Sequence, residues 1–260
     1  MSSPDPLAAF RLDGRLITVT GASDGLGRAF AEAFAALGAR VVLAARRRDK
    51  LEEVQRAIIA AGGRAEVAVT DVCKLADIRA LADTVARLAG ADDRLVLVNN
   101  AGLGFTRPAL DVTEDEWDAL FDLHVKGTFF CSQQIGALML ARGYGKIINL
   151  SSAWAASTDI GKSAYCTAKA AIGHLSAALS TEWAPQGVRV NALAPTTTLT
   201  DFVKGTMAAR PDRAERLKSR IKLGRFAVPD DMIGAAVFLA SAASDFVTGQ
   251  TLFVDGGFSS

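Results

Sequence analysis

The chain has few of the residues that usually hold a metal ion or a disulfide framework. Its 260 residues include only three cysteines, Cys73, Cys131 and Cys166, and two histidines. None of the cysteines stands at the short spacings that zinc ligands keep. We therefore predict no metal site, and we expect three reduced thiols in a reducing compartment.

An excess of charge of one sign is also missing. Lysine and arginine number 29 against 28 aspartates and glutamates, so no broad basic field is available for nucleic acid or an anionic membrane. No apolar run approaches the ~18 residues that cross a bilayer, and the N-terminus has no cationic start followed by a long apolar core. We expect a cytoplasmic protein whose partner is a small molecule.

Apolar strands and helices alternate regularly along the chain. Half of the residues are hydrophobic, which is enough to bury a sizeable core. Continuous apolar strands that alternate with helices are typical of a parallel sheet covered on both faces. The predicted strands are 15–20, 40–45, 65–69, 95–98, 146–150, 188–193 and 251–254. Helices are predicted at 28–37, 49–61 and 75–89, and a longer helix begins at the capping box of Thr113 and Glu116.

We expect a single domain over residues 1–260, because no repeat, low-complexity tract or linker interrupts this alternation. Residues 1–10 form a proline-containing arm. The least regular part is about 196–225, which is charged and is broken by Gly205 and Pro211. Because it lies between core elements, we interpret it as a mobile pair of lid helices near the substrate; the alternative is a disordered segment.

A glycine-rich turn, TGASDGLG, joins the first strand to the first helix. Glycines permit a tight turn and let backbone N–H groups approach a pyrophosphate at the helix N-terminus. In the first strand-to-helix turn of a parallel sheet, this pattern predicts a dinucleotide site. The predicted cofactor contacts in the turn are Gly21, Ser23, Asp24, Gly25, Leu26 and Gly27.

The end of the second strand indicates which dinucleotide is bound. An acidic residue there commonly binds the 2′-hydroxyl of NAD, whereas an arginine accommodates the 2′-phosphate of NADP. The sequence has Arg46, Arg47 and Arg48 and no carboxylate at this place. We predict that NADP(H) is preferred, with Arg46 at the phosphate, and that NAD(H) is possible. An ordinary basic cap after a strand is the alternative.

Two further strand ends offer cofactor contacts. Asp71 can accept a hydrogen bond from the adenine amino group and Val72 can pack on the ring, although Asp71 can equally cap the next helix. After the fourth strand, the small residues Ala101 and Gly102 leave room for a cofactor. Asn99, with the asparagine that follows it, can tie neighbouring strand ends together by hydrogen bonds.

Tyr165 and Lys169 stand four residues apart in an alanine-rich run that we interpret as a helix, so they share one face. The pKa of a free tyrosine is about 10, too high for easy proton exchange near neutral pH. A neighbouring ammonium favours the phenolate and lowers that pKa, which makes the phenol a usable acid/base. Ser152 is placed to offer its hydroxyl to the same substrate oxygen. The alternative is an ordinary surface helix.

Together these motifs resemble the short-chain dehydrogenase/reductase family. The resemblance covers nearly the whole chain: the TGASDGLG turn, the Asp71-Val72 pair, NNAG at 99–102, Ser152 thirteen residues before Tyr165, the YCTAK segment, residues 191–195 and the closing VTGQTLFVDGG. It implies a Rossmann-type, doubly wound parallel sheet of seven strands with helices on both faces. It also implies hydride transfer between NAD(P)(H) and a carbonyl or an alcohol.

The resemblance implies roles for individual residues. Tyr165 is the acid/base, Lys169 lowers its pKa and holds the nicotinamide ribose, and Ser152 orients the substrate oxygen. Contacts to the nicotinamide carboxamide fall on residues 195–200, with Pro195, Thr198 and Thr200 as the predicted positions.

The family is typically dimeric or tetrameric, and its C-terminal strand and neighbouring helix often pack at the interface. A homo-oligomer is therefore implied. The apolar tail around Phe253 and Phe258 suits such an interface.

Three positions depart from the family's pattern. His124 stands where an asparagine usually anchors a proton-relay water; it can hold such a water, add its own titration, or be a tolerated core histidine. Thr196 replaces a glycine, so the nearby loop is expected to be reshaped. Asp24 replaces an arginine often seen in NADP-dependent members, which leaves Arg46 to hold the phosphate nearly alone.

The leading hypothesis is an NADP(H)-dependent oxidoreductase acting on a ketone or secondary alcohol. A gluconate-type sugar-acid dehydrogenase and a 3-oxoacyl thioester reductase are the alternatives; a basic lid with Lys204, Arg210, Arg213, Arg216, Lys218 and Arg220 suits the thioester. An apolar set of Phe105, Trp154, Ala155 and Phe202 slightly favours a hydrophobic ketone. A catalytically weak nucleotide-binding sensor or scaffold, suggested by His124, is the alternative from a different class.

Overall fold

The computed structural model describes residues 7–260, apart from the side chain of Phe202. Seven parallel strands form one sheet in the order β3-β2-β1-β4-β5-β6-β7. This confirms the predicted fold class. The strands are β1 Arg15–Thr20, β2 Arg40–Ala45, β3 Arg64–Val69, β4 Arg94–Asn99, β5 Gly145–Leu150, β6 Val188–Pro195 and β7 Thr251–Val254.

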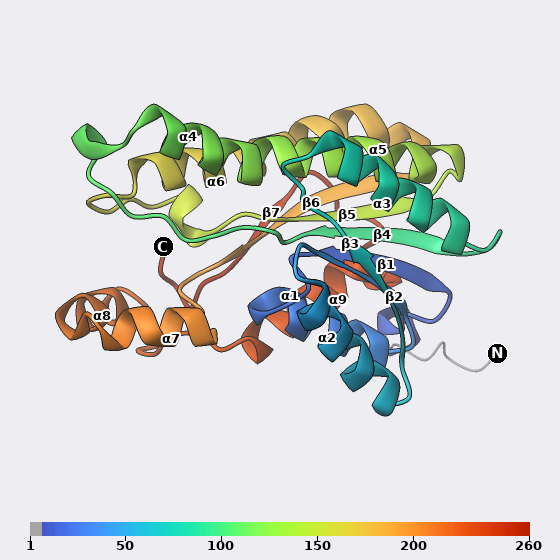
Figure 1. The fold of residues 1–260 in the computed structure, drawn as a ribbon, viewed down its shortest axis with the longest axis horizontal. Coiled ribbons are helices and arrows are strands. Elements are labelled where there is room, and N and C mark those ends of the chain that lie inside the picture. Colours follow the sequence, from blue (N-terminus) through green and yellow to red (C-terminus); the bar gives the residue numbers. More distant parts are fainter. Residues whose placement is uncertain (1–6) are drawn as a thin grey trace.

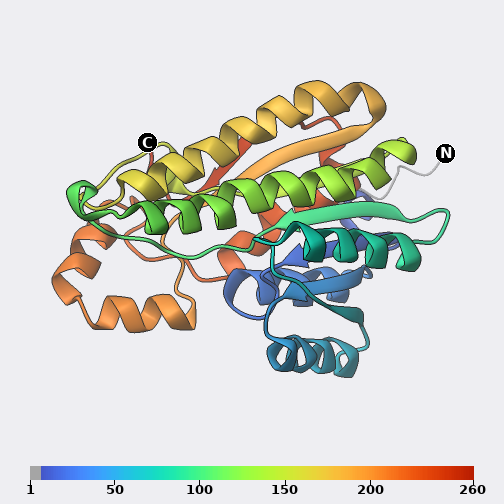
Figure 2. The same cartoon turned by 45° about the horizontal axis from the view of Figure 1, so that its top comes forward.

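Helices cover both faces of the sheet (Figures 1 and 2). One face is covered by α1 (Gly25–Ala36), α2 (Arg48–Ala60) and α9 (Asp230–Ala240). The other is covered by α3 (Leu75–Leu88), α5 (Gly127–Ala141) and α6 (Ser163–Trp183). No helix of residues 7–260 is long and apolar enough to cross a membrane.

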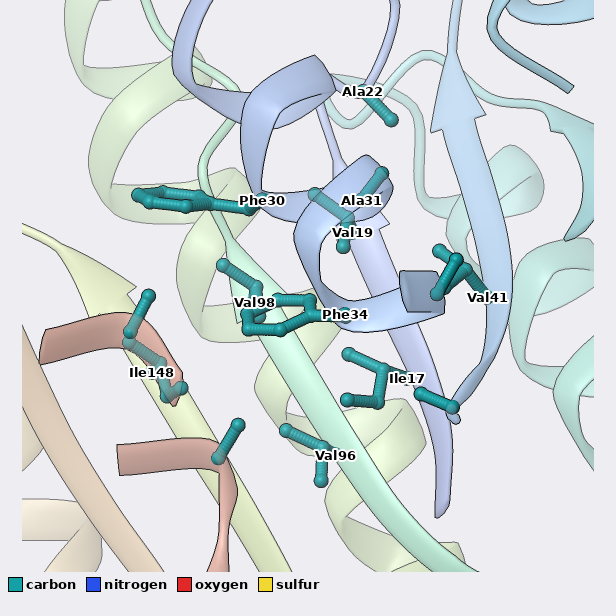
Figure 3. Close-up of a cluster of buried hydrophobic side chains, with 14 of the residues drawn as sticks. Ile17, Val19, Ala22, Phe30, Ala31, Phe34, Val41, Val96, Val98 and Ile148 are labelled. Carbon is teal, nitrogen blue, oxygen red and sulfur yellow. The ribbon is translucent and has the colours of Figure 1, made fainter. Parts of the chain in front are cut away.

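The two helical layers explain why the strands are continuously apolar. Ile17 and Val19 of β1 pack with Phe30 and Phe34 of α1 on one side of the sheet (Figure 3), whereas Leu16 packs into the cluster on the opposite side. Successive side chains of a strand point to opposite faces, and here both faces are buried.

The sheet reverses its order of connection between β1 and β4. Val19 of β1 lies beside Leu43 of β2 on one side and beside Val98 of β4 on the other. The loops that follow these two strands leave in opposite directions, which makes this place the switch point of the sheet. In open α/β sheets, ligands bind at the carboxyl ends of the strands at the switch point. The glycine turn after β1 and residues 99–102 after β4 both begin there.

The helix predicted after Thr113 is divided. Its capping box is present, because the Thr113 side chain accepts from the backbone N–H of Glu116 and the Glu116 side chain accepts from that of Thr113. Between α4 (Glu114–Phe121) and α5, residues Asp122–Lys126 form a π-helix. A π-turn places one extra residue in the helix and often occurs at functional sites. His124 lies within it.

Residues 196–225 contain the predicted pair of helices, α7 (Asp201–Ala208) and α8 (Pro211–Ser219). Figure 1 shows them in orange to the left of the sheet layers. Their role as a mobile lid stays a prediction. Of the predicted N-terminal arm, residues 1–6 lie outside the described part of the chain, and Ala8–Phe10 form one 3₁₀ turn.

Candidate active site

The three predicted catalytic side chains meet at the carboxyl end of β5. Ser152 follows that strand, and Tyr165 lies in the first turn of α6. The Ser152 side chain is close enough to Tyr165 to lower the pKa of its phenol. Lys169, one turn further along α6, has its Nζ 5.8 Å from the centroid of the Tyr165 ring and donates to the carbonyl oxygen of Leu150 at 2.7 Å.

Burial controls the ionisation of this pair. It raises the pKa of Tyr165 to about 12, against the lowering effect of the Ser152 side chain, and it lowers the pKa of Lys169 to about 7. Burial thus acts on the phenol pKa in the direction opposite to the effect predicted for Lys169. The physical reason is that desolvation disfavours the charged form of each group. At neutral pH these groups hold the phenol protonated.

His124 lies beside Tyr165. Their rings meet edge to face at 5.7 Å between centroids. The His124 side chain is 1% exposed, its Nε2 lies 3.0 Å from the carbonyl oxygen of Leu103, and its Nδ1 is buried with no hydrogen-bond partner among the described residues. A Cβ on Gly102 would lie 2.6 Å from His124 Cε1, so this glycine is required for the histidine to sit there.

The glycine turn brings backbone against backbone. Gly21 and Gly25 have positive φ angles of 66° and 54°, which suit glycine. A Cβ on Gly21 would lie 2.9 Å from Ala101 Cα, and one on Gly27 would lie 2.2 Å from the carbonyl oxygen of Gly21. The predicted contact Leu26 packs against the core. The turn is therefore a backbone cradle at the N-terminus of α1, as a pyrophosphate site requires.

Asp24 starts α1 earlier than predicted. Its carboxylate accepts from the backbone N–H of Gly25 at 2.7 Å, so the helix begins at Gly25 and not at residue 28. A capping carboxylate is favoured there by the helix dipole.

Arg47 is a neighbour of the turn that the sequence analysis did not select. Its guanidinium donates to Ser23 Oγ at 3.2 Å and lies 4.0 Å from Asp24 Oδ2. The predicted phosphate ligand Arg46 is exposed. It lies near the Cys73 thiol, and its positive charge acts to lower the thiol pKa, although burial raises that pKa overall. Two guanidinium groups, not one, are thus available at the end of β2. The run of three arginines was the only available signal for Arg47.

The asparagines after β4 tie strand ends together, as predicted. Asn99 donates to Asn149 Oδ1 at 2.8 Å and to Ser132 Oγ at 2.9 Å. Asn100 donates to the carbonyl oxygens of Thr20 and Gly21. Because the Asn99 side chain is 4% exposed and its Nδ2 donates to these partners, we expect a cofactor contact from this residue to come from its backbone.

Asp71 and Val72 lie in the loop between β3 and α3. The Asp71 carboxylate accepts from the backbone N–H of Cys73 at 3.1 Å, and Val72 is 8% exposed. The residue that precedes α3 directly is Lys74, so Asp71 shapes the loop rather than capping the helix. Contact with an adenine stays a prediction for both residues.

The segment 195–200 is held close to both the catalytic side chains and the glycine turn. The Pro195 carbonyl oxygen lies 3.4 Å from Ser152 Oγ, and a Cβ on Gly25 would lie 3.0 Å from Thr200 Cγ2. Thr198 forms a parallel β-bridge with Ala227. Thr196 has no positive φ, as for every non-glycine residue described, and its buried hydroxyl has no described partner.

The apolar residues expected around the substrate are partly used elsewhere. Trp154 is 7% exposed and packs with Phe258 and with Leu217 of α8. Phe105 packs in the same cluster as Tyr165, against Leu120, Ala164 and Ala168, and its carbonyl oxygen accepts from Lys162 Nζ at 2.7 Å. The side chain of Phe202 lies outside the described residues. Lys162, a buried cation beside Tyr165, was not selected from the sequence, because no local pattern distinguishes it.

Known proteins resemble this chain along nearly its whole length. A family model described as enoyl-(acyl carrier protein) reductase matches residues 21–259. The D-threitol dehydrogenase of Mycolicibacterium smegmatis is 38% identical over 249 residues, which cover 96% of this chain and 94% of that protein. The NAD-dependent glycerol dehydrogenase of Listeria innocua is 35% identical over 250 residues, covering 96% and 95%.

One solved structure is especially informative about ligands. A gluconate 5-dehydrogenase from Burkholderia cenocepacia, crystallised in complex with NADP and tartrate, is similar to this chain with a TM-score of 0.92. The two sequences are 37% identical, and the similarity covers 98% of both chains.

Proposed function

The chain belongs to the short-chain dehydrogenase/reductase family, and from this premise we propose that it is an NADP(H)-dependent oxidoreductase that interconverts a secondary alcohol and a ketone. The observation that supports the proposal most directly is the meeting of Ser152, Tyr165 and Lys169 at the carboxyl end of β5. These groups lie beside the segment 195–200, which also contacts the glycine turn.

The residues at the switch point fit a dinucleotide. Gly21 and Gly25 have the positive φ angles of a backbone cradle, and the N-terminus of α1 favours an anionic pyrophosphate. Arg46 and Arg47 would hold a 2′-phosphate, which favours NADP(H). NAD(H) remains possible, since Asp24 places one carboxylate 4.0 Å from Arg47, and the glycerol dehydrogenase relative is named as NAD-dependent.

When bound, the nicotinamide supplies or accepts the hydride. Tyr165 gives a proton to the substrate oxygen during reduction and takes it back during oxidation. Ser152 donates a hydrogen bond to the same oxygen and stabilises the negative charge that develops there. Lys169 lies on the same face of α6 and favours the phenolate when it is charged. Because the phenol is protonated at neutral pH, the protein's own groups favour the acid role.

We assign His124 a positioning role. Its buried Nδ1 has hydrogen-bonding capacity that no described group uses, and buried polar groups are usually satisfied by protein or by ordered water. The atom lies on a ring that contacts Tyr165, so a water held there would stand next to the acid/base.

Small polyols and sugar acids are the substrate class that we propose. The relatives are named for threitol, glycerol and gluconate. Half of the basic lid residues expected to suit a thioester are paired within the chain, because Lys204, Arg216 and Lys218 lie beside Asp201, Asp159 and Glu215. A hydrophobic ketone is less well supported than expected, since Trp154 is engaged in packing.

We further propose a homo-oligomer located in the cytoplasm. An apolar hollow of about 360 Å³ lies on the outer face of α5 and α6, and we assign it to a second copy of the chain. It is lined by Phe121, Asp122, Val125, Lys126, Phe129, Phe130 and Leu175. Phe253 is 37% exposed, but Phe258 packs inside its own chain against Trp154. The three free cysteines agree with a reducing compartment.

The role of Tyr165 is tested by Tyr165→Phe, which keeps the aromatic ring and removes the hydroxyl group that would donate or accept the proton. We expect NADPH oxidation with a panel of ketones and keto-sugars to fall by at least about 10²-fold, while NADPH binding, followed by its fluorescence, is preserved. Tyr144→Phe is the matched control. Tyr144 lies at the opposite end of β5, so its removal should leave turnover intact. Near-normal turnover in Tyr165→Phe would refute the role.

A further inference from the structure

Three segments meet next to Tyr165 on its substrate side. The loop after β4 contacts the loop before α6, because the backbone N–H of Arg107 donates to the Gly161 carbonyl oxygen at 2.9 Å. The lid helix α8 contacts both loops, since Arg213 donates to Thr106 Oγ1 and Arg216 pairs with Asp159. Any substrate that reaches the Tyr165 hydroxyl is therefore close to side chains from all three segments.

Lys162 is a buried cation at this meeting point. Its side chain is 8% exposed, and its Nζ lies 5.0 Å from the centroid of the Tyr165 ring and 5.9 Å from that of Trp154. The one hydrogen-bond partner of its ammonium among the described residues is the neutral carbonyl oxygen of Phe105. A buried ammonium without a carboxylate partner is costly, and burial here lowers the pKa of Lys162 to about 8.

The arginines of α8 and of its C-cap, Arg220, differ in how many hydrogen-bond partners they have. Arg213, Arg216 and Arg220 lie three and four residues apart and so share one face. Arg216 makes a two-point contact with Asp159 at 2.8 and 2.9 Å, and Arg220 donates to Ser157 Oγ and to the Thr158 carbonyl oxygen. Arg213 has only the hydroxyl of Thr106, at 3.3 Å, and its buried Nε has no described partner.

Positive charge is therefore in excess around the substrate side of Tyr165. Of Lys162, Arg213, Arg216 and Arg220, only Arg216 forms an ion pair with a described carboxylate. Lys162 and Arg213 donate to the adjacent residues Phe105 and Thr106, and the charge of Arg213 contributes to the lowered pKa of Lys162. An anion between them would relieve this repulsion and satisfy the unpaired donors.

We propose that Lys162 and Arg213 bind a carboxylate of the substrate, so that the enzyme acts on a hydroxy acid or its keto acid in preference to a neutral polyol. The inference rests on the proposed oxidoreductase function and specifies its substrate. Because Lys162 Nζ lies 5.0 Å from the Tyr165 ring, the carboxylate is within a few carbon atoms of the carbon that is oxidised. A planar guanidinium and a point charge together suit a carboxylate well.

The cofactor does not account for these two cations. Its phosphates are expected at the glycine turn and at Arg46 and Arg47, at the ends of β1 and β2, whereas Lys162 and Arg213 lie beyond Tyr165 next to the loop that follows β4. In an acid substrate with two carboxylates, such as tartrate, the second carboxylate would lie near Arg216 or in solvent.

The experiment compares kcat/KM for acids and for alcohols of the same carbon skeleton and configuration. The pairs are tartrate with threitol and gluconate with glucitol. The measurements are made at pH 7, where Lys162 is charged. We expect the wild-type kcat/KM to favour the acid of at least one pair. Lys162→Met and Arg213→Gln should each lower kcat/KM for that acid about 10- to 100-fold and change the value for the alcohol less than about threefold. Arg210→Gln, an exposed lid arginine, is the matched control and should change neither.

Binding is measured separately with malonate, a dicarboxylate that has no hydroxyl group to oxidise. Calorimetric titration into the enzyme with NADP⁺ should show binding that weakens about 10-fold or more in each of the two variants. Malonate binding that is absent, or equal in wild type and variants, would overturn the inference even if no substrate is turned over. Equal losses for acid and alcohol would overturn it too, because they would show a merely structural role for the two cations. No turnover of any substrate with either cofactor would instead count against the proposed function.

Discussion

At the scale of single residues, His124 has its ionisation fixed by its surroundings. Burial and the nearby Lys169 lower its pKa to about 3, although the hydrogen bond with Leu103 acts in the opposite direction. A neutral imidazole is therefore present throughout the pH range in which most enzymes work. Of the roles predicted for this histidine, titration near neutral pH is the one that its environment opposes.

This environment makes the stability of the protein depend on pH. The pKa of His124 is lower in the folded chain than the ordinary value of 6.5, so the unfolded chain binds more protons between these values and stability falls as the pH falls from 6.5 toward 3. On going from pH 7 to 4.5, we expect the wild type to lose about 2 kcal/mol more unfolding free energy than His124→Asn. Urea denaturation at both pH values measures this difference; equal losses in the two proteins would contradict it.

At the scale of secondary-structure elements, the turn between β1 and α1 depends on the absence of side chains. A Cβ on Gly27 would lie 2.2 Å from the Gly21 carbonyl oxygen and 2.5 Å from Asn100 Nδ2. Neither atom can move freely, because the Asn100 amide also donates to the carbonyl oxygen of Thr20. A side chain at this position would therefore displace the turn itself.

Gly27→Ala is accordingly expected to weaken NADPH binding at least about 10-fold, since the backbone N–H groups that face the pyrophosphate are displaced. Fluorescence titration of NADPH measures the loss. Gly234→Ala is the matched control, because Gly234 is exposed in the middle of α9 with no atom within 4 Å of the added Cβ. We expect it to stabilise the fold by about 0.5–1 kcal/mol without changing cofactor affinity. Unchanged NADPH affinity in Gly27→Ala would count against a cradle at this turn.

The elements themselves were largely predictable from the sequence. Every strand was predicted to within about two residues, because burial of both faces makes each strand a continuous apolar run. The π-helix at Asp122–Lys126 was not predicted, since its residues have no pattern that differs from an α-helix. The start of α1 was placed too late because its glycines were assigned to the turn, whereas Asp24 already caps the helix.

The candidate site was predictable in its members but not in its electrostatics. The spacing of Tyr165 and Lys169 is a local property of a helix and can be read from the chain. The direction of the Tyr165 pKa shift also depends on burial by distant segments, which raises this pKa and cannot be read from the local spacing. Lys162 and Arg213 are 51 positions apart in the numbering of the chain, so only the fold shows that they donate to the adjacent residues Phe105 and Thr106.

At the scale of the whole molecule, the two ends of the sheet differ in what their charged residues do. At the amino end, Lys146 of β5 is 1% exposed and lies 3.0 Å from Asp245 and 2.7 Å from Ser244 Oγ. The Tyr144 hydroxyl donates to the same carboxylate at 2.9 Å. Guanidinium groups of Arg15, Arg94 and Arg189 lie 4.9–5.8 Å from the Tyr144 ring centroid. This network contacts none of the candidate catalytic residues.

Asp245→Asn should therefore reduce stability and leave catalysis unchanged. Removing the carboxylate leaves Lys146 buried without its counter-charge, which should lower the unfolding free energy by roughly 2–3 kcal/mol. The loss is smaller than for a fully buried ion pair because Asp245 is partly exposed. The pKa of Lys146 is already lowered to about 8 by burial. The cost should thus be larger at pH 6, where Lys146 is charged, than at pH 9, where it is largely neutral.

Thermal unfolding and kcat/KM are measured at both pH values. Glu215→Gln, which breaks an exposed ion pair with Lys218, is the control and should change stability by less than about 0.5 kcal/mol. An equal loss at pH 6 and pH 9, or a loss of activity that matches the loss of stability, would contradict the separation of the two ends.

Strand β5 connects these two regions, with Lys146 near one end and Ser152 just beyond the other. We therefore expect substitutions of Lys162 or Arg213 to change substrate preference while leaving the stability contributed by the Lys146 network unaltered.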